Sequence, residues 1–214
     1  MELTTQQLQR VEHYLNVKDI TYIDIRTEVF DHIVSDIETK IETEKLDFET
    51  VFYNVTDKWN IHLKQTSSWL YGIAYSAPKI VMKKVNNNFR KWFLISNSLM
   101  ILLSMAEKEL NLSFSKNTQV FLTNSLVIIN IISSFILVFL MTKNSKIKEK
   151  TSYSFILKTQ SLGFFLGFVA IFFSGIIEGV TPIYSLTLTY IAVTYIYSHF
   201  LKKHKEAIKK YKIL

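Results

Sequence analysis

The chain contains no cysteine, and only five of its 214 residues are glycine and two are proline. Without cysteine it has no disulfide, no thiol chemistry and no cysteine-ligated zinc or iron–sulfur site. So little glycine and proline disfavours turn-rich sheet architectures and long disordered linkers. With abundant Ile, Leu and Phe, this composition predicts an all-α protein.

The sequence also lacks recognisable reactive groups. We find no paired acids, histidine cluster or Ser/His set in its apolar segments, and no nucleotide-binding loop. Residues 1–6 lack the basic and apolar regions of a cleavable signal peptide, so we expect membrane insertion to use an internal span. These absences predict a protein that is not an enzyme and holds no cofactor or metal.

Charge divides the chain sharply. Residues 1–66 carry seven basic and thirteen acidic residues, a net charge of −6. Residues 67–214 carry 18 basic and five acidic residues, a net charge of +13. Because the basic part is also the apolar part, we interpret it as a membrane domain rather than a nucleic-acid-binding one.

Local signals predict three helices in a small acidic cytosolic domain, residues 1–65. Each start carries a capping signal, namely Thr4 with Gln7, Thr21 with Asp24, and Asp47. The helices are expected near residues 5–16, from 21 to about 44, and after 47. Their apolar residues recur at helical spacing, as in the stripe Ile25, Val29, Ile33, Ile37 and Ile41. A core of this size is marginal, so we expect the isolated fragment 1–65 to unfold readily or dimerise.

Residues 66–91 connect this domain to the apolar part. They are aromatic and amphipathic, and Pro78 suits the first turn of a new helix. We interpret them as an amphipathic connecting or interfacial segment, in which the run Lys79–Val85 forms either a helix at headgroup level or a plain connecting helix. Four apolar stretches follow within residues 92–201, at 92–106, 120–141, 155–177 and 183–201. Their lengths predict a four-helix transmembrane bundle, the first span borrowing from its flanks.

Lysine and arginine predict the orientation of these spans. They cluster before the first span, between the second and third, and in the tail 202–214, whereas the other two connections hold few. By the positive-inside rule both termini are cytoplasmic, and we expect a multi-pass protein of the bacterial cytoplasmic (inner) membrane. The lysine-rich tail is expected either to bind anionic lipid headgroups or to dock onto the acidic domain.

A line of polar residues on the second predicted helix is the first candidate site. Glu28, Asp31, His32 and Asp36 project from one helical face. With His13 or His62 they would resemble a metal site, but such sites need ligands converging from several elements. The same pattern is explained by a solvated acidic face, by a partner-binding surface or by salt bridges to the basic loops. We assign these residues to partner binding.

Two further patterns lie in the apolar segments. Gly163, Gly167, Ala170 and Ser174 form a small-residue face, which predicts close helix packing within the chain or between two copies. Thr187, Tyr190, Thr194 and Tyr197 form a polar stripe on the fourth span, suited to interhelical hydrogen bonding or to lining a solute path. No Asp, Glu, Arg or His lies at mid-depth in any span, which weighs against ion-coupled transport.

The stretch Arg26-Thr27-Glu28-Val29-Phe30-Asp31-His32-Ile33, continuing to Glu38, resembles the second helix of the bacterial HAAS-type domain. The likeness spans residues 8–63 and includes the Glu/Lys-rich helix end and the capped third helix. Members of that group place a short helical domain before several membrane spans. They are often associated with PadR-type transcriptional regulators and regarded as signalling or adaptor proteins. The resemblance implies no catalytic residues.

These observations predict a non-enzymatic integral membrane adaptor or signalling protein. Its partners would be membrane lipids and a protein, or a second copy, bound through the cytosolic domain, with no nucleic acid. The alternative is a small transporter subunit or channel that uses the polar fourth span. An intramembrane enzyme has the least support.

Overall fold

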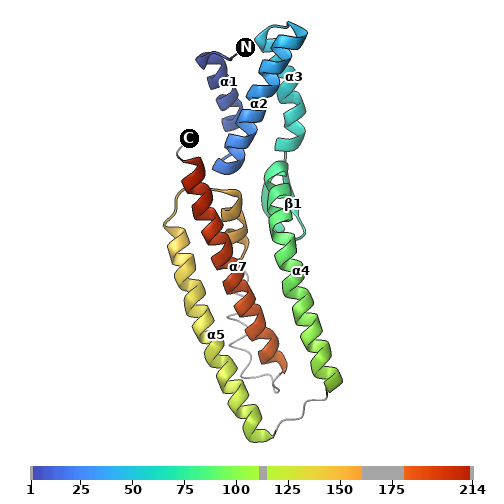
Figure 1. Ribbon diagram of the computed structural model, residues 1–214, viewed down its shortest axis with the longest axis vertical. Coiled ribbons are helices and arrows are strands. Elements are labelled where there is room, and N and C mark those ends of the chain that lie inside the picture. Colours follow the sequence, from blue (N-terminus) through green and yellow to red (C-terminus); the bar gives the residue numbers. More distant parts are fainter. Residues whose placement is uncertain (1, 111–114, 161–180, 213–214) are drawn as a thin grey trace. The chain divides into compact units, whose positions relative to one another are not determined.

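A computed structural model describes residues 2–110, 115–160 and 181–212. The described chain is mostly helical, as the composition predicts, with one short hairpin (Figure 1). Its elements are α1 (Thr5–Val17), α2 (Ile23–Glu44), α3 (Phe48–Leu63), β1 (Gln65–Ser68), β2 (Gly72–Pro78), α4 (Lys79–Leu110), α5 (Lys116–Ser145), a helical stretch over residues 152–160, and α7 (Thr181–Tyr211).

The chain forms two compact units. Unit 1 comprises Met1–Asn87, Glu149–Phe155 and His204–Leu214, and unit 2 comprises Asn88–Lys148 and Ile156–Lys203. The chain therefore passes from one unit to the other four times, three of them within helices, namely α4, the stretch over residues 152–160 and α7. Unit 1 is thus built from three separate parts of the sequence.

The first three helices of unit 1 form the N-terminal bundle, in which α2 packs against both α1 and α3 (Figure 1). The predicted stripe on α2 is buried from Ile25 to Ile37, while Ile41 is only half-buried. Facing residues from the other two helices complete the core, among them Val11, Leu15, Val51, Phe52 and Val55. Burial of these side chains is the main force that holds three short helices together.

Two of the three predicted caps are confirmed. Thr4 and Gln7 form a reciprocal capping box, and the Asp47 carboxylate accepts a hydrogen bond from the Thr50 amide at 3.0 Å. The prediction that Thr21 caps the second helix is wrong. Tyr22 occupies that position without a side-chain hydrogen bond, because the backbone of a distant segment caps α2 instead, as described below.

Residues 65–78 form an antiparallel β-hairpin, which the sequence did not predict. The register pairs Gln65 with Pro78 and Ser67 with Ser76, then breaks between Ser67 and Ser68. Gly72 has φ +84°, a conformation that a residue with a Cβ rarely adopts, and it turns the chain back into β2. Pro78 directly precedes α4, so the predicted helix start there is confirmed.

Unit 2 contains the apolar parts of α4, α5 and α7. Asn130 of α5 donates a hydrogen bond to Thr187 of α7, and Trp92 of α4 lies against His199 of α7 with ring centroids 4.8 Å apart. The opposite sides of these helices expose large apolar side chains, Phe121 and Phe135 among them. Of the helices in the described ranges, one, α5, is long and apolar enough to cross a membrane.

Candidate functional site: a buried polar junction

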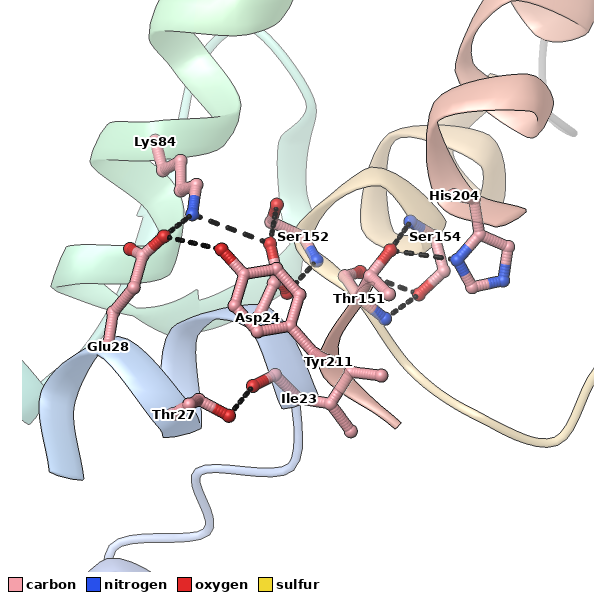
Figure 2. Close-up of polar contacts among 10 residues, drawn as sticks. All are labelled: Ile23, Asp24, Thr27, Glu28, Lys84, Thr151, Ser152, Ser154, His204 and Tyr211. Atoms are coloured by element: carbon pink, nitrogen blue, oxygen red, sulfur yellow. Dashed lines mark hydrogen bonds and ion pairs between the residues drawn. The ribbon is translucent and has the colours of Figure 1, made fainter. Parts of the chain in front are cut away.

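The most unusual group in unit 1 is the carboxylate of Asp24, in the first turn of α2. The residue is 1% exposed, and most buried carboxylates need several partners to offset the loss of water. Asp24 accepts hydrogen bonds from the Ser152 amide at 2.8 Å and the Ser152 hydroxyl at 2.5 Å, and Lys84 Nζ lies 3.6 Å away (Figure 2). These partners come from two other parts of the sequence.

Asp24 also lies at two helix N-termini at once. It sits in the first turn of α2, and its partner Ser152 begins the helical stretch over residues 152–160. Both ends carry partial positive charge and unpaired amides, which favour a carboxylate. In return, the Lys150 carbonyl accepts a hydrogen bond from the Ile23 amide at 2.9 Å. The first turn of α2 therefore caps the helical stretch, and the residues just before that stretch cap α2.

Lys84 of α4 extends this cluster to Glu28. Its Nζ lies 2.8 Å from a Glu28 carboxylate oxygen, which also accepts a hydrogen bond from the Tyr211 hydroxyl at 3.2 Å (Figure 2). Burial lowers the Lys84 pKa, but the hydrogen bond to Glu28 and the charges of Asp24 and Glu28 outweigh this, so the pKa is raised. Lys84 is therefore a permanent cation between two carboxylates.

His204 of α7 forms the other end of the cluster. This buried side chain places Nδ1 2.8 Å from the Thr151 hydroxyl, and the donor depends on the histidine tautomer. Thr151 and Ser154 cap the helical stretch reciprocally through their hydroxyls and amides. Burial lowers the pKa of His204, while the charges of Asp24 and Glu149 oppose that shift and Lys205 adds to it. Burial therefore favours the neutral imidazole.

We call this group the polar junction, and Figure 2 shows its side chains converging from four parts of the chain. Its members are Asp24 and Glu28 of α2, Lys84 of α4, Thr151, Ser152 and Ser154 of the middle segment, and His204 and Tyr211 of α7. Near it, the Phe155 ring makes edge contacts with Tyr22, Tyr71 and Tyr75. The junction therefore has an apolar rim.

The four residues that the sequence assigned to partner binding separate into two groups. Glu28 turns to Lys84 and Tyr211, in agreement with the salt-bridge alternative. Asp31, His32 and Asp36 are exposed on α2, and His32 stacks on Trp59 of α3 with centroids 6.4 Å apart. Within the described ranges no three side chains of the metal-ligating types lie close enough to share an ion.

The predicted features of the apolar segments fall partly outside the described residues. The small-residue face at Gly163, Gly167, Ala170 and Ser174 lies there entirely. The polar stripe lies on α7. Thr187, Tyr190 and Tyr197 are buried, Thr187 accepts from Asn130 Nδ2 at 2.9 Å, and Thr194 is 3.5 Å from the Ser133 carbonyl. The contacts described for the stripe are those of helix packing.

Most of the junction was not singled out from the sequence. The polar run Thr151-Ser152-Tyr153-Ser154 carries the hydroxyl pattern of a helix start, and that signal would have located it. Nothing local identifies Lys84 or His204, because their partners are remote in sequence. No protein-family model, curated protein or solved structure matches this chain.

Proposed function

We propose that this protein is a non-enzymatic integral membrane adaptor or signalling protein. Its N-terminal bundle lies in the cytoplasm and binds a protein partner that presents a basic surface. The observation that best supports the proposal is the polar junction, because it makes α2 part of the same unit as the ends of α4 and α7. The junction holds the N-terminal bundle to the segments of α4 and α7 that belong to unit 1.

The membrane assignment rests on the helices of unit 2. Their outward sides carry exposed apolar residues along α4 and α5, among them Leu94, Ile101, Leu102, Ile132 and Phe139. Soluble proteins seldom expose so many large apolar side chains. The four spans of the sequence, with unit 1 on the lysine-rich cytoplasmic side, account for this surface.

The partner surface is the exposed side of α2 with the neighbouring part of α3. Asp31 and Asp36 contribute negative charge, and Trp59 contacts the rings of both His32 and His62. An acidic face with an aromatic centre suits a basic protein surface, since aromatic residues often anchor interfaces and complementary charge guides association. A partner bound here acts on the helix whose first turn holds the junction.

The test is recovery of partners from native membranes with the tagged full-length chain after mild crosslinking. The variant D31N/H32A/D36N should recover the partner about tenfold less well than the wild type. The matched control E2Q/E12Q/H13A removes two exposed acids and one exposed histidine from elsewhere. It should behave as the wild type.

The proposed surface would be contradicted if D31N/H32A/D36N recovered as much partner as the wild type. It would also be contradicted if the control variant lost as much partner as D31N/H32A/D36N. If the partner is a second copy of this chain, tagged and untagged chains should co-purify in the wild type but not in D31N/H32A/D36N. Transport through the α7 stripe remains a prediction from the sequence, and no contact described for the stripe favours it over packing.

A further inference from the structure

Unit 1 contains a cavity that the proposed partner surface does not use. It has a volume of about 720 Å³ and lies where the end of α1, the start of α2, the end of α3 and the hairpin meet Lys150. Its polar lining includes Lys18, Lys64, Lys150, Tyr22, Asn60 and Ser76. Cavities of roughly 300–1,000 Å³ are typical of sites for small organic ligands.

The charge of this cavity is unbalanced. Three lysines line it, and Asp19 is the acid among its lining residues. In the part of the chain that the structure describes, Lys64 and Lys150 form no ion pair, and the contact found for the Lys18 ammonium is the Tyr14 ring at 5.7 Å. Positive charge gathered in a concave surface attracts an anion more strongly than the same charge on a convex one.

The lysines are also fixed through their backbones. The Lys18 amide donates to the Tyr14 carbonyl at 3.1 Å, the Lys64 carbonyl accepts from the Lys79 amide at 2.9 Å, and the Lys150 carbonyl accepts from the Ile23 amide at 2.9 Å. Three elements that are remote in sequence thus hold the lysines around one space. Such preorganisation reduces the entropy lost when a ligand binds.

Neutral groups add hydrogen-bond capacity and apolar contact. Burial, followed by the charges of Asp19 and Asp24, raises the pKa of Tyr22, so its phenol keeps its proton and remains a donor at neutral pH. The Asn60 carboxamide oxygen accepts from the Tyr14 hydroxyl at 3.1 Å, which orients the amide. Leu63, Ala77 and Pro78 give the lining an apolar part.

We propose that this cavity binds the phosphate group of a phosphorylated organic molecule. Lysines are common partners of phosphate, and the space is larger than a bare phosphate requires. The same chemistry is offered by a phospholipid headgroup and by a soluble phosphorylated metabolite. The site goes beyond the proposed adaptor function, since it shares no residue with the surface at Asp31, His32 and Asp36. Lys150 directly precedes Thr151 of the junction and Tyr22 lies two residues before Asp24, so a bound phosphate lies beside the capped helix ends.

The experiment uses the full-length chain in two arms. In the soluble arm, protein in phosphatidylcholine nanodiscs is titrated with inorganic pyrophosphate by calorimetry. In the lipid arm, native mass spectrometry compares retention of phosphatidylglycerol with retention of phosphatidylcholine by the delipidated protein. Each arm tests K64Q/K150Q, which removes two cavity charges, and S76F, which fills the space without changing charge.

Binding in at least one arm should weaken about tenfold in both variants and weaken further as ionic strength rises. The control K58Q/K83Q removes two exposed lysines of unit 1 outside the cavity and should bind as the wild type. Binding in the soluble arm alone supports a metabolite, binding in the lipid arm alone supports a headgroup, and binding in both supports the shared chemistry.

No binding of either probe would overturn the proposal, as would unchanged affinity in K64Q/K150Q or an equal loss in the control. Circular dichroism shows whether each variant remains folded, and the exposed positions of Lys64, Lys150 and Ser76 make folding defects unexpected. Recovery of the protein partner by K64Q/K150Q separates failure of this site from failure of the adaptor function.

Discussion

The carboxylate of Asp24 accepts two hydrogen bonds from Ser152, at 2.8 Å from the amide and 2.5 Å from the hydroxyl, although 128 positions separate the two residues. Both residues are buried. The unfolded chain rarely brings positions so far apart together, so this contact belongs to the folded state. It fixes the start of α2 to the start of the helical stretch at residues 152–160.

Asp24→Ala should destabilise the full-length protein by about 3 kcal/mol, because it leaves the buried Ser152 amide and hydroxyl without an acceptor. Ser152→Ala should cost less, about 1.5 kcal/mol, because the amide still binds Asp24. The measurement is reversible denaturation in detergent micelles. Thr43→Ala removes an exposed hydroxyl bonded to the Thr39 carbonyl and should have almost no effect. If Asp24→Ala behaves like this control, the junction does not stabilise unit 1.

Because His204 is buried, we expect the protein to lose stability in mild acid. Since burial depresses its folded-state pKa, the unfolded chain binds the proton at higher pH than the folded protein does. The stability that neutral His204 contributes is present above the unfolded-state pKa of about 6.5, and it is lost as the pH falls through the folded-state pKa. Melting temperatures between about pH 7 and about pH 5 should fall less in His204→Gln than in the wild type. The exposed His13→Gln variant should keep the wild-type slope, and an equal slope in His204→Gln would exclude this residue as the cause.

The isolated fragment 1–65 should melt at low temperature or dimerise. The structure supplies a reason beyond its small core, because the fragment loses Ser152, Lys84 and the Lys150 carbonyl and leaves Asp24 and the Ile23 amide without partners. Circular dichroism and light scattering measure melting and mass. A monomeric fragment with a high melting temperature would show that the bundle is stable without the junction.

Thr187→Val should weaken unit 2 by about 1 kcal/mol, because the buried Asn130 amide loses its acceptor on α7. The measurement is unfolding in mixed dodecyl sulfate and lipid micelles. Thr142→Val serves as the control, since that exposed hydroxyl bonds within its own helix. Equal stability of both variants would show that the stripe is not held by this hydrogen bond.

Local signals predicted the helices of the bundle well. Thr4, Gln7 and Asp47 act within one turn of their own positions, and the stripe on α2 reflects a single helix period. The Thr21 cap failed because the Lys150 carbonyl takes that role, and a cap from so far along the chain leaves no nearby trace. The hairpin was not predicted, because the sequence of residues 65–78 fits an amphipathic connecting segment as well as it fits two short strands.

The candidate site was predicted only in part. A salt bridge from the acidic helix to the basic segments was one of several alternatives for this face, and Glu28 forms one with Lys84. The central residue, Asp24, was interpreted as a local capping partner, because burial cannot be read from a single acid in an apolar turn. His204 was counted only as part of a basic tail, and its burial depends on packing against Thr151.

The backbone hydrogen bond from Lys79 to Lys64 joins the end of α3 to the beginning of α4, so the two ends of the hairpin lie close together within unit 1. The distance between the two helix ends is therefore set by this hydrogen bond and not by the length of the hairpin. Its tip, where the Trp69 side chain is 84% exposed, is therefore a suitable place to insert a label or an affinity tag. A reporter there would follow unit 1 while the caps, the cavity and the partner surface keep their native sequence.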